Sequence, residues 1–133
     1  MERVGQAVAA VVLTGWVAVG MALTPSPTGS GTHTVLGLPP CGMLVATGHP
    51  CPTCGVTTSF VLAAHGRPID ALVNQPFGLA VFLGVLGVWG FTIVTLATGR
   101  TWSGLLTAFN VTTAVVIITV IALISWAYKW SVT

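Results

Sequence analysis

The sequence predicts an all-helical integral membrane protein, and two observations lead to this prediction. Of the 133 residues, 54% are hydrophobic and only 5% are charged, whereas an ordinary soluble domain is about 25% charged. In addition, three segments are long and apolar enough to cross the roughly 30 Å hydrocarbon core of a bilayer. A soluble fold of this size must solvate a large polar surface, which this composition cannot supply.

The same composition excludes several other classes of protein. A disordered chain needs low hydrophobicity and high charge. The four Lys and Arg residues are scattered and the net charge is only +2, so there is no basic patch for nucleic acid. The sequence also lacks a Ser-His-Asp constellation, paired carboxylates and a phosphate-binding glycine loop. We therefore favour a non-catalytic protein whose partners are the lipid bilayer and other membrane subunits.

The three expected spans are bounded by residues that suit helix ends. They cover about residues 4–23, 77–98 and 105–128. Pro25 ends the first span, Pro76 opens the second, and Lys129 closes the third. The first span could instead be a cleaved signal peptide, but it is longer than the roughly 7–15 residues of a signal core and no convincing small-x-small cleavage site precedes Pro25.

The unusual region is residues 25–75, between the first and second spans. Its first part is rich in Pro, Gly, Ser and Thr, which predicts an irregular loop outside the hydrocarbon. Residues 55–65 predict a helix too short to cross the bilayer, with Thr53 as N-cap and Gly66 as C-terminal stop. A second short helix is expected from Pro68. Both short helices should lie at the membrane interface, within a single membrane domain of residues 1–133.

The orientation in the membrane is inferred from the positive charges. With the N-terminus inside, Arg3 and Arg100 are cytoplasmic, whereas Arg67 and Lys129 are external, so the positive-inside count is a tie. The first helix usually weighs most, and Arg67 has a nearby ion-pair partner in Asp70. We favour a cytoplasmic N-terminus and an external cysteine loop, in the inner membrane of a bacterium.

The chain's three cysteines, Cys41, Cys51 and Cys54, all lie in this loop, and three interpretations remain open. A structural disulfide from Cys41 to either partner would close a loop of about ten residues and add about 2–4 kcal/mol of stability. Alternatively, Cys-x-x-Cys at a helix start is typical of thiol redox chemistry. Finally, the three cysteines with His49 would form a Cys₃His set for zinc or another thiophilic metal.

The residues around the cysteines resemble a family of small bacterial membrane proteins, DUF2752, a domain of unknown function. The family motif is Cys-Pro-x-Cys-Gly-x-Thr, which matches residues 51–57. The flanking matches are Cys41, Thr47-Gly48, Gly66, Ala71, Asn74 and Pro76. Two positions depart from the family pattern: Thr58 stands where the family usually has Arg, and Gln75 separates Asn74 from Pro76. The resemblance implies a helical membrane protein with a structured cysteine loop, and it implies no activity.

Two further sets of residues suggest packing rather than chemistry. Gly84, Gly87 and Gly90 in the second span let another helix approach closely, either within the chain or from another subunit. Asn110, near the start of the third span, is expected to bond a neighbouring helix or to face water.

Two functional hypotheses follow. The first is an accessory or scaffolding subunit of a larger membrane complex, by analogy with small subunits of bacterial respiratory assemblies. No cofactor is expected for it. The alternative is a thiol-redox or metal-binding protein that uses Cys51-Pro52-Thr53-Cys54.

Overall fold

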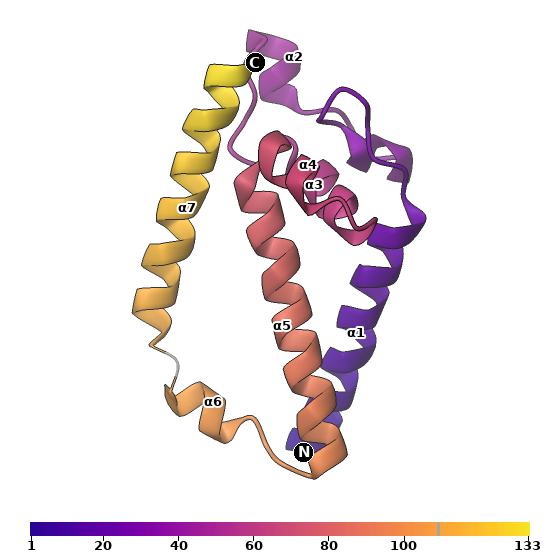
Figure 1. The fold of residues 1–133 in the computed structure, drawn as a ribbon, viewed down its shortest axis with the longest axis vertical. Coiled ribbons are helices and arrows are strands. Elements are labelled where there is room, and N and C mark those ends of the chain that lie inside the picture. The colour runs from indigo at the N-terminus through magenta and orange to yellow at the C-terminus, as the bar shows by residue number, and fades with distance from the viewer. Residues whose placement is uncertain (109) are drawn as a thin grey trace.

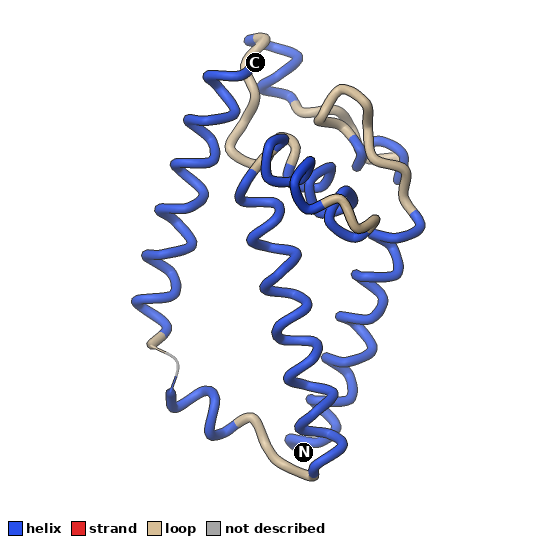
Figure 2. The backbone as a smooth tube through the Cα atoms, viewed as in Figure 1, coloured by secondary structure: helices blue, strands red, loops and turns tan. Residues whose placement is uncertain are grey.

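The computed structural model describes residues 1–108 and 110–133, with the side chains of residues 105, 106 and 108 excepted. Every regular element within these residues is a helix (Figures 1 and 2). Three helices are long and apolar enough to cross a membrane: α1 (Glu2–Ala22), α5 (Pro76–Thr98) and α7 (Val111–Val132). The predicted all-helical class with three spans is therefore confirmed.

The first two spans lie within two residues of their expected bounds, whereas the third differs at both ends. A separate short helix, α6 (Ser103–Ala108), precedes α7. Asn110 is the N-cap of α7, where its Oδ1 accepts the Thr113 N–H at 3.3 Å, so its expected place inside the span is wrong. The helix also continues past Lys129 to Val132, and the Lys129 side chain finds its acceptors inside the protein. Residue 109, which the expected span also included, lies outside the described residues.

Four short helical elements gather at one end of the long helices, together with most of the loop backbone (Figure 2). They are η1 (Thr32–Leu36), α2 (Gly42–Thr47), α3 (Val56–Ala64) and α4 (Pro68–Asn74). The two short helices expected from the sequence are α3 and α4. The Thr53 cap is wrong, because Gly55 takes that position with a φ of +87°, a conformation that favours glycine. Gly66 has a φ of +73°, which confirms the expected stop after α3.

Helix α3 forms the centre of the packed core, between α1, α4 and α5. Phe60 contacts Phe82 of α5 edge to face, with ring centroids 5.2 Å apart. Two glycines allow this close approach. A Cβ at Gly20 would lie 2.8 Å from the Phe60 ring, and one at Gly78 would lie 2.7 Å from the Val56 carbonyl oxygen. Such contacts suit membrane helices, which associate largely through close packing.

The expected glycine stripe of α5 makes no such contact within the described chain. A Cβ at Gly84, Gly87 or Gly90 would have nothing within 4 Å. Their packing against another subunit stays a prediction, since this surface is equally suited to lipid.

Candidate functional site

The cysteine cluster lies at the end of the bundle where the short helices gather. The sulfur atoms of Cys41, Cys51 and Cys54 all lie within 4.8 Å of one another. Cys54 is buried, whereas Cys41 and Cys51 are partly exposed. The three thiols therefore form a group with one inner member and two members on the open side.

Local backbone structure places these sulfurs. Cys41 is the N-cap residue of α2, and Cys51 opens a turn in which the Cys54 N–H donates to the Cys51 carbonyl at 3.0 Å. Gly55 then turns the chain into α3. Because Cys51 and Cys54 are only three positions apart, their sulfurs lie 3.4 Å from each other. Helix α2 and the loop after it then bring the chain back from Cys41, so that the Cys41 sulfur lies beside the other two.

Side chains of α4, of the α4–α5 junction and of α7 support this irregular backbone by donating to its carbonyl groups. Trp126 and Trp130 of α7 both donate their indole N–H to the Pro50 carbonyl, at 3.0 and 3.3 Å. Gln75 donates to the Pro52 carbonyl at 3.0 Å, and Asn74 to the Gly55 carbonyl at 3.2 Å. Backbone outside regular helices has to find such partners near a membrane. The two indole groups of α7 thus hold the cysteine loop.

The surroundings shift the pKa values of Cys41 and Cys54 in opposite directions. The backbone N–H of Leu44, followed by the thiols of Cys54 and Cys51, lowers the pKa of Cys41 to about 7. Burial, followed by the neighbouring Cys41, raises the pKa of Cys54 to about 12. Since the thiolate is the reactive and metal-binding form, Cys41 on the open side is more ready to react than the buried Cys54.

The expected disulfide is not formed in this structure. All three cysteines are free, and the 3.4 Å between the Cys51 and Cys54 sulfurs exceeds the roughly 2.05 Å of a disulfide bond. The sulfur of Cys51 instead donates a weak hydrogen bond to Cys54.

Other residues singled out from the sequence lie apart from this group. His49 does not join the three sulfurs, and its ring stacks against Trp130 with centroids 4.6 Å apart. Arg67 and Asp70 form an ion pair, Nε to Oδ2 at 2.7 Å, with both side chains more than half exposed. Exposed pairs of this kind contribute about 0–1 kcal/mol.

The polar residues that hold the loop are chiefly Asn74, Gln75 and Lys129, and the sequence pattern did not reveal this role. Lys129 is only 8% exposed, and its Nζ donates to Asn74 Oδ1 at 2.9 Å. The one available signal was the polar pair Asn74-Gln75 directly before an apolar span. Its partners are too distant in the sequence to be inferred.

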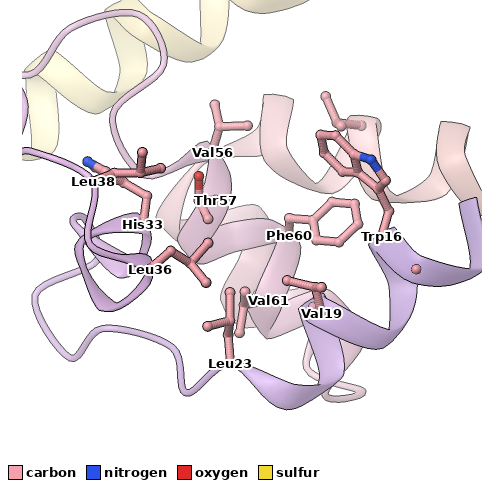
Figure 3. A pocket seen from close by; sticks show the side chains of 13 residues that line it. Trp16, Val19, Leu23, His33, Leu36, Leu38, Val56, Thr57, Phe60 and Val61 are labelled. Atoms are coloured by element: carbon pink, nitrogen blue, oxygen red, sulfur yellow. The ribbon is translucent and has the colours of Figure 1, made fainter. Parts of the chain in front are cut away.

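An apolar pocket of about 350 Å³ lies beside α1 and contains no cysteine in its lining. In Figure 3, His33, Leu36 and Leu38 border one side, and Trp16 and Phe60 border the other. It opens among residues of a spanning helix, where hydrocarbon chains are the surrounding solvent. The pocket is thus separate from the cysteine cluster.

The fold and the site define a small three-span helical membrane protein with a cluster of three cysteines at one end of its bundle. Comparison with known families matches residues 41–89 to the family described as protein of unknown function DUF2752. The resemblance suggested by the cysteine motif is thereby confirmed over this segment, which runs from Cys41 into α5. No curated protein and no solved structure gives a significant match.

Proposed function

We propose that this protein binds a thiophilic metal ion at the membrane surface through Cys41, Cys51 and Cys54. The observation that carries the proposal is the convergence of the three sulfurs within 4.8 Å. Cys41 is ten positions from Cys51 and thirteen from Cys54, and yet the fold of the loop brings the three thiols together. The function proposed is reversible metal binding rather than catalysis.

The sulfur spacing is close to what a shared metal ion requires. Two thiolates bound to one zinc ion at about 2.3 Å in tetrahedral geometry have sulfurs about 3.8 Å apart. The Cys51–Cys54 distance is 3.4 Å, and no pair exceeds 4.8 Å. Small side-chain rotations would therefore bring the three sulfurs onto one ion, with no rearrangement of the helices.

The exposure of the cluster favours exchange over a purely structural role. Structural zinc sites are usually closed by four protein ligands, whereas sites with three protein ligands keep a position open. Here Cys41 and Cys51 are partly exposed, and His49 is engaged with Trp130. A fourth ligand would come from water or from a molecule that delivers or accepts the ion. Thiolates suit Zn²⁺ and Cu⁺, and we propose these two as the candidate ions.

A second candidate function is thiol-disulfide exchange, which the 3.4 Å contact between the Cys51 and Cys54 sulfurs favours. Oxidation would remove two electrons and two protons from this pair, and a disulfide-containing partner would accept them. The low pKa of Cys41, about 7, would suit it to attack a mixed disulfide. An external location of the loop in a bacterial inner membrane belongs to this proposal.

The proposals can be separated on one preparation of the full chain. The protein, carrying an affinity tag without histidines, is purified in mild detergent under reducing conditions, loaded with Zn²⁺ or Cu⁺ and desalted. We expect about one tightly held ion per chain by elemental analysis. Serine variants of Cys41, Cys51 and Cys54 should each lose it, whereas His49→Ala, matched by its place in the same loop, should retain it.

Two results would contradict the metal proposal. One is retention of the ion by the variant with all three cysteines replaced. The other is an ion-free wild type whose intact mass shows the loss of two hydrogens, which would favour the redox function instead. Proteins that co-elute in fixed stoichiometry from the native membrane would support the accessory-subunit hypothesis.

A further inference from the structure

A second, polar pocket lies at the same end of the bundle as the cysteines but on other elements. It has a volume of about 690 Å³ and lies between the loop of residues 25–29, helix α4 and the last turn of α7. The charged residues in its lining are Arg67, Asp70 and Lys129. None of the three cysteines lines it.

Lys129 is the central observation, because its ammonium points inward. A lysine in the last turn of a spanning helix ordinarily extends its charge into water. Here the residue is only 8% exposed. Its Nζ donates to Asn74 Oδ1 at 2.9 Å, to the Gly29 carbonyl at 3.3 Å and to the Asn74 carbonyl at 3.4 Å. All three acceptors are uncharged.

No carboxylate of the lining balances this charge. Asp70 is the acidic residue of the pocket, and its Oδ2 is bound to Arg67 Nε at 2.7 Å. The pocket therefore has a net charge of +1, from Arg67, Lys129 and Asp70. Buried charges in proteins are normally paired. The buried Lys129 ammonium thus has no anionic partner in the pocket lining. The cavity beside it has room for one.

The position of the pocket indicates where such an anion would come from. Lys129 lies in the last turn of α7, and the pocket wall continues with apolar side chains such as Leu62, Val73 and Val132. The end of a spanning helix lies at the level of the lipid headgroups. Basic pockets between membrane helices at this level bind phosphate-bearing headgroups.

We propose that this pocket binds the phosphate group of an anionic phospholipid. Lys129 supplies the charge as a compact point donor, a common way for proteins to hold phosphate. The two longer hydrogen bonds of its Nζ, at 3.3 and 3.4 Å, are the ones a phosphate oxygen would replace. The apolar wall then receives the beginning of the acyl chains. The binding does not depend on the cysteine cluster.

The test is native mass spectrometry of the purified full chain mixed with equal amounts of phosphatidylglycerol and phosphatidylcholine. We expect the wild type to retain phosphatidylglycerol several-fold more than phosphatidylcholine. Lys129→Gln should abolish this preference. Arg100→Gln removes the same charge from an exposed residue at the opposite end of the bundle, and it should preserve the preference.

A second variant covers the case in which Lys129→Gln fails to fold. Arg67→Gln changes an exposed side chain and frees Asp70, which makes the pocket neutral, so the preference should fall clearly. Equal retention of both lipids by the wild type, or unchanged preference in the pocket variants, would overturn the proposal. So would displacement of phosphatidylglycerol by millimolar inorganic phosphate, which would assign the pocket to free phosphate. The preference should persist when all three cysteines are serine, whatever the result of metal binding.

Discussion

The two ends of the helical bundle differ in how the helices are joined. At the cysteine end, side chains from α4, the α4–α5 junction and α7 donate hydrogen bonds to loop carbonyls, as Asn74, Gln75 and Trp126 do. At the end that carries the N-terminus (Figure 1), α1 meets the segment after α5 through Gln6, which donates to the Arg100 carbonyl at 3.2 Å, and through Arg3, which donates to the Gly99 carbonyl at 3.4 Å.

Helix α7 makes the contrast plain. Within the described part of the chain, its side chains that bond other elements lie in its last eight residues; they are Ser125, Trp126, Tyr128, Lys129 and Trp130. Irregular backbone near a membrane needs internal hydrogen-bond partners, and regular helices do not. Polar side chains are therefore concentrated where the cysteine loop is, and the remainder of α7 is left to lipid or to another subunit.

The largest expected effect is a difference in alkylation rate between two thiols at the cysteine end, the partly exposed Cys41 and the buried Cys54. In metal-free, reduced protein, Cys41 should be alkylated by iodoacetamide at least about 100-fold faster than Cys54 at neutral pH, because only the thiolate reacts. The pKa values of about 7 for Cys41 and about 12 for Cys54 set this order. The rates are read for each cysteine by peptide mass spectrometry from about pH 6 to about pH 9.

The pH dependence of each alkylation rate follows from whether the pKa of that thiol is lowered or raised. The alkylation rate of Cys41 should rise through about pH 7 and then level off, whereas that of Cys54 should stay low throughout this range. Since folding lowers the pKa of Cys41, ionised Cys41 favours the folded state at alkaline pH. This contribution disappears as the pH falls through about 7. Equal rates for the two thiols would contradict the difference in their surroundings.

The second prediction compares two glycines of α5, one near the cysteine end and one farther along. A Cβ at Gly78 would lie 2.7 Å from the Val56 carbonyl oxygen and 2.5 Å from Ser59 Cβ, whereas one at Gly84 meets nothing within 4 Å. We expect Gly78→Val to lower the free energy of unfolding by about 3 kcal/mol. Gly84→Val should change it by less than about 0.5 kcal/mol.

These two variants are compared by unfolding in detergent micelles. A destabilised Gly84→Val would show that the exposed stripe of α5 packs against something, and its oligomeric state would then be measured. Similar stability of both variants would refute the close packing of α3 on α5.

The third prediction compares two asparagines. Asn74 serves Lys129, Gly55 and Ser59 at once, whereas Asn110 caps α7 at its other end. Asn74→Ala should lower the free energy of unfolding by about 2 kcal/mol, because hydrogen bonds to charged groups contribute about 1.5–3 kcal/mol. Asn110→Ala should cost about 1 kcal/mol, as for a lost helix cap. The reverse order of melting temperatures would contradict the concentration of stabilising contacts at the cysteine end.

The smallest effects are expected from the indole groups. Trp126→Phe and Trp130→Phe each remove one hydrogen bond to the Pro50 carbonyl and should each lower the free energy of unfolding by about 1 kcal/mol. Trp89→Phe removes a similar bond to Thr14 between α1 and α5. It should cost as much in stability but leave the alkylation rate of Cys51 unchanged, whereas loss of both α7 indoles should raise that rate. An unchanged rate in the double variant would show that α7 does not hold the cysteine loop.

Several features of the fold could be read from local sequence. The three apolar segments predicted the spans, and Gly66 and Pro68 marked the end of α3 and the start of α4. The cysteine motif indicated the loop in which the candidate site lies and a family resemblance that the comparison supports over residues 41–89. Where the sequence misled, the deciding contact was non-local or a matter of backbone conformation, as at Gly55, which replaces Thr53 at the start of α3.

By itself the sequence determined the class of the protein, because the length and apolarity of a segment decide whether it can cross a bilayer. Only the tertiary structure decided which groups meet. The Lys129 ammonium reaches the carbonyl of Gly29, 100 positions away, and Trp130 reaches Pro50, 80 positions away. Within the described residues, close contacts are made at Gly20 and Gly78 and not at Gly84, Gly87 or Gly90, because α3 lies across the first two. Such contacts depend on the packing of whole helices, which no local pattern of residues specifies.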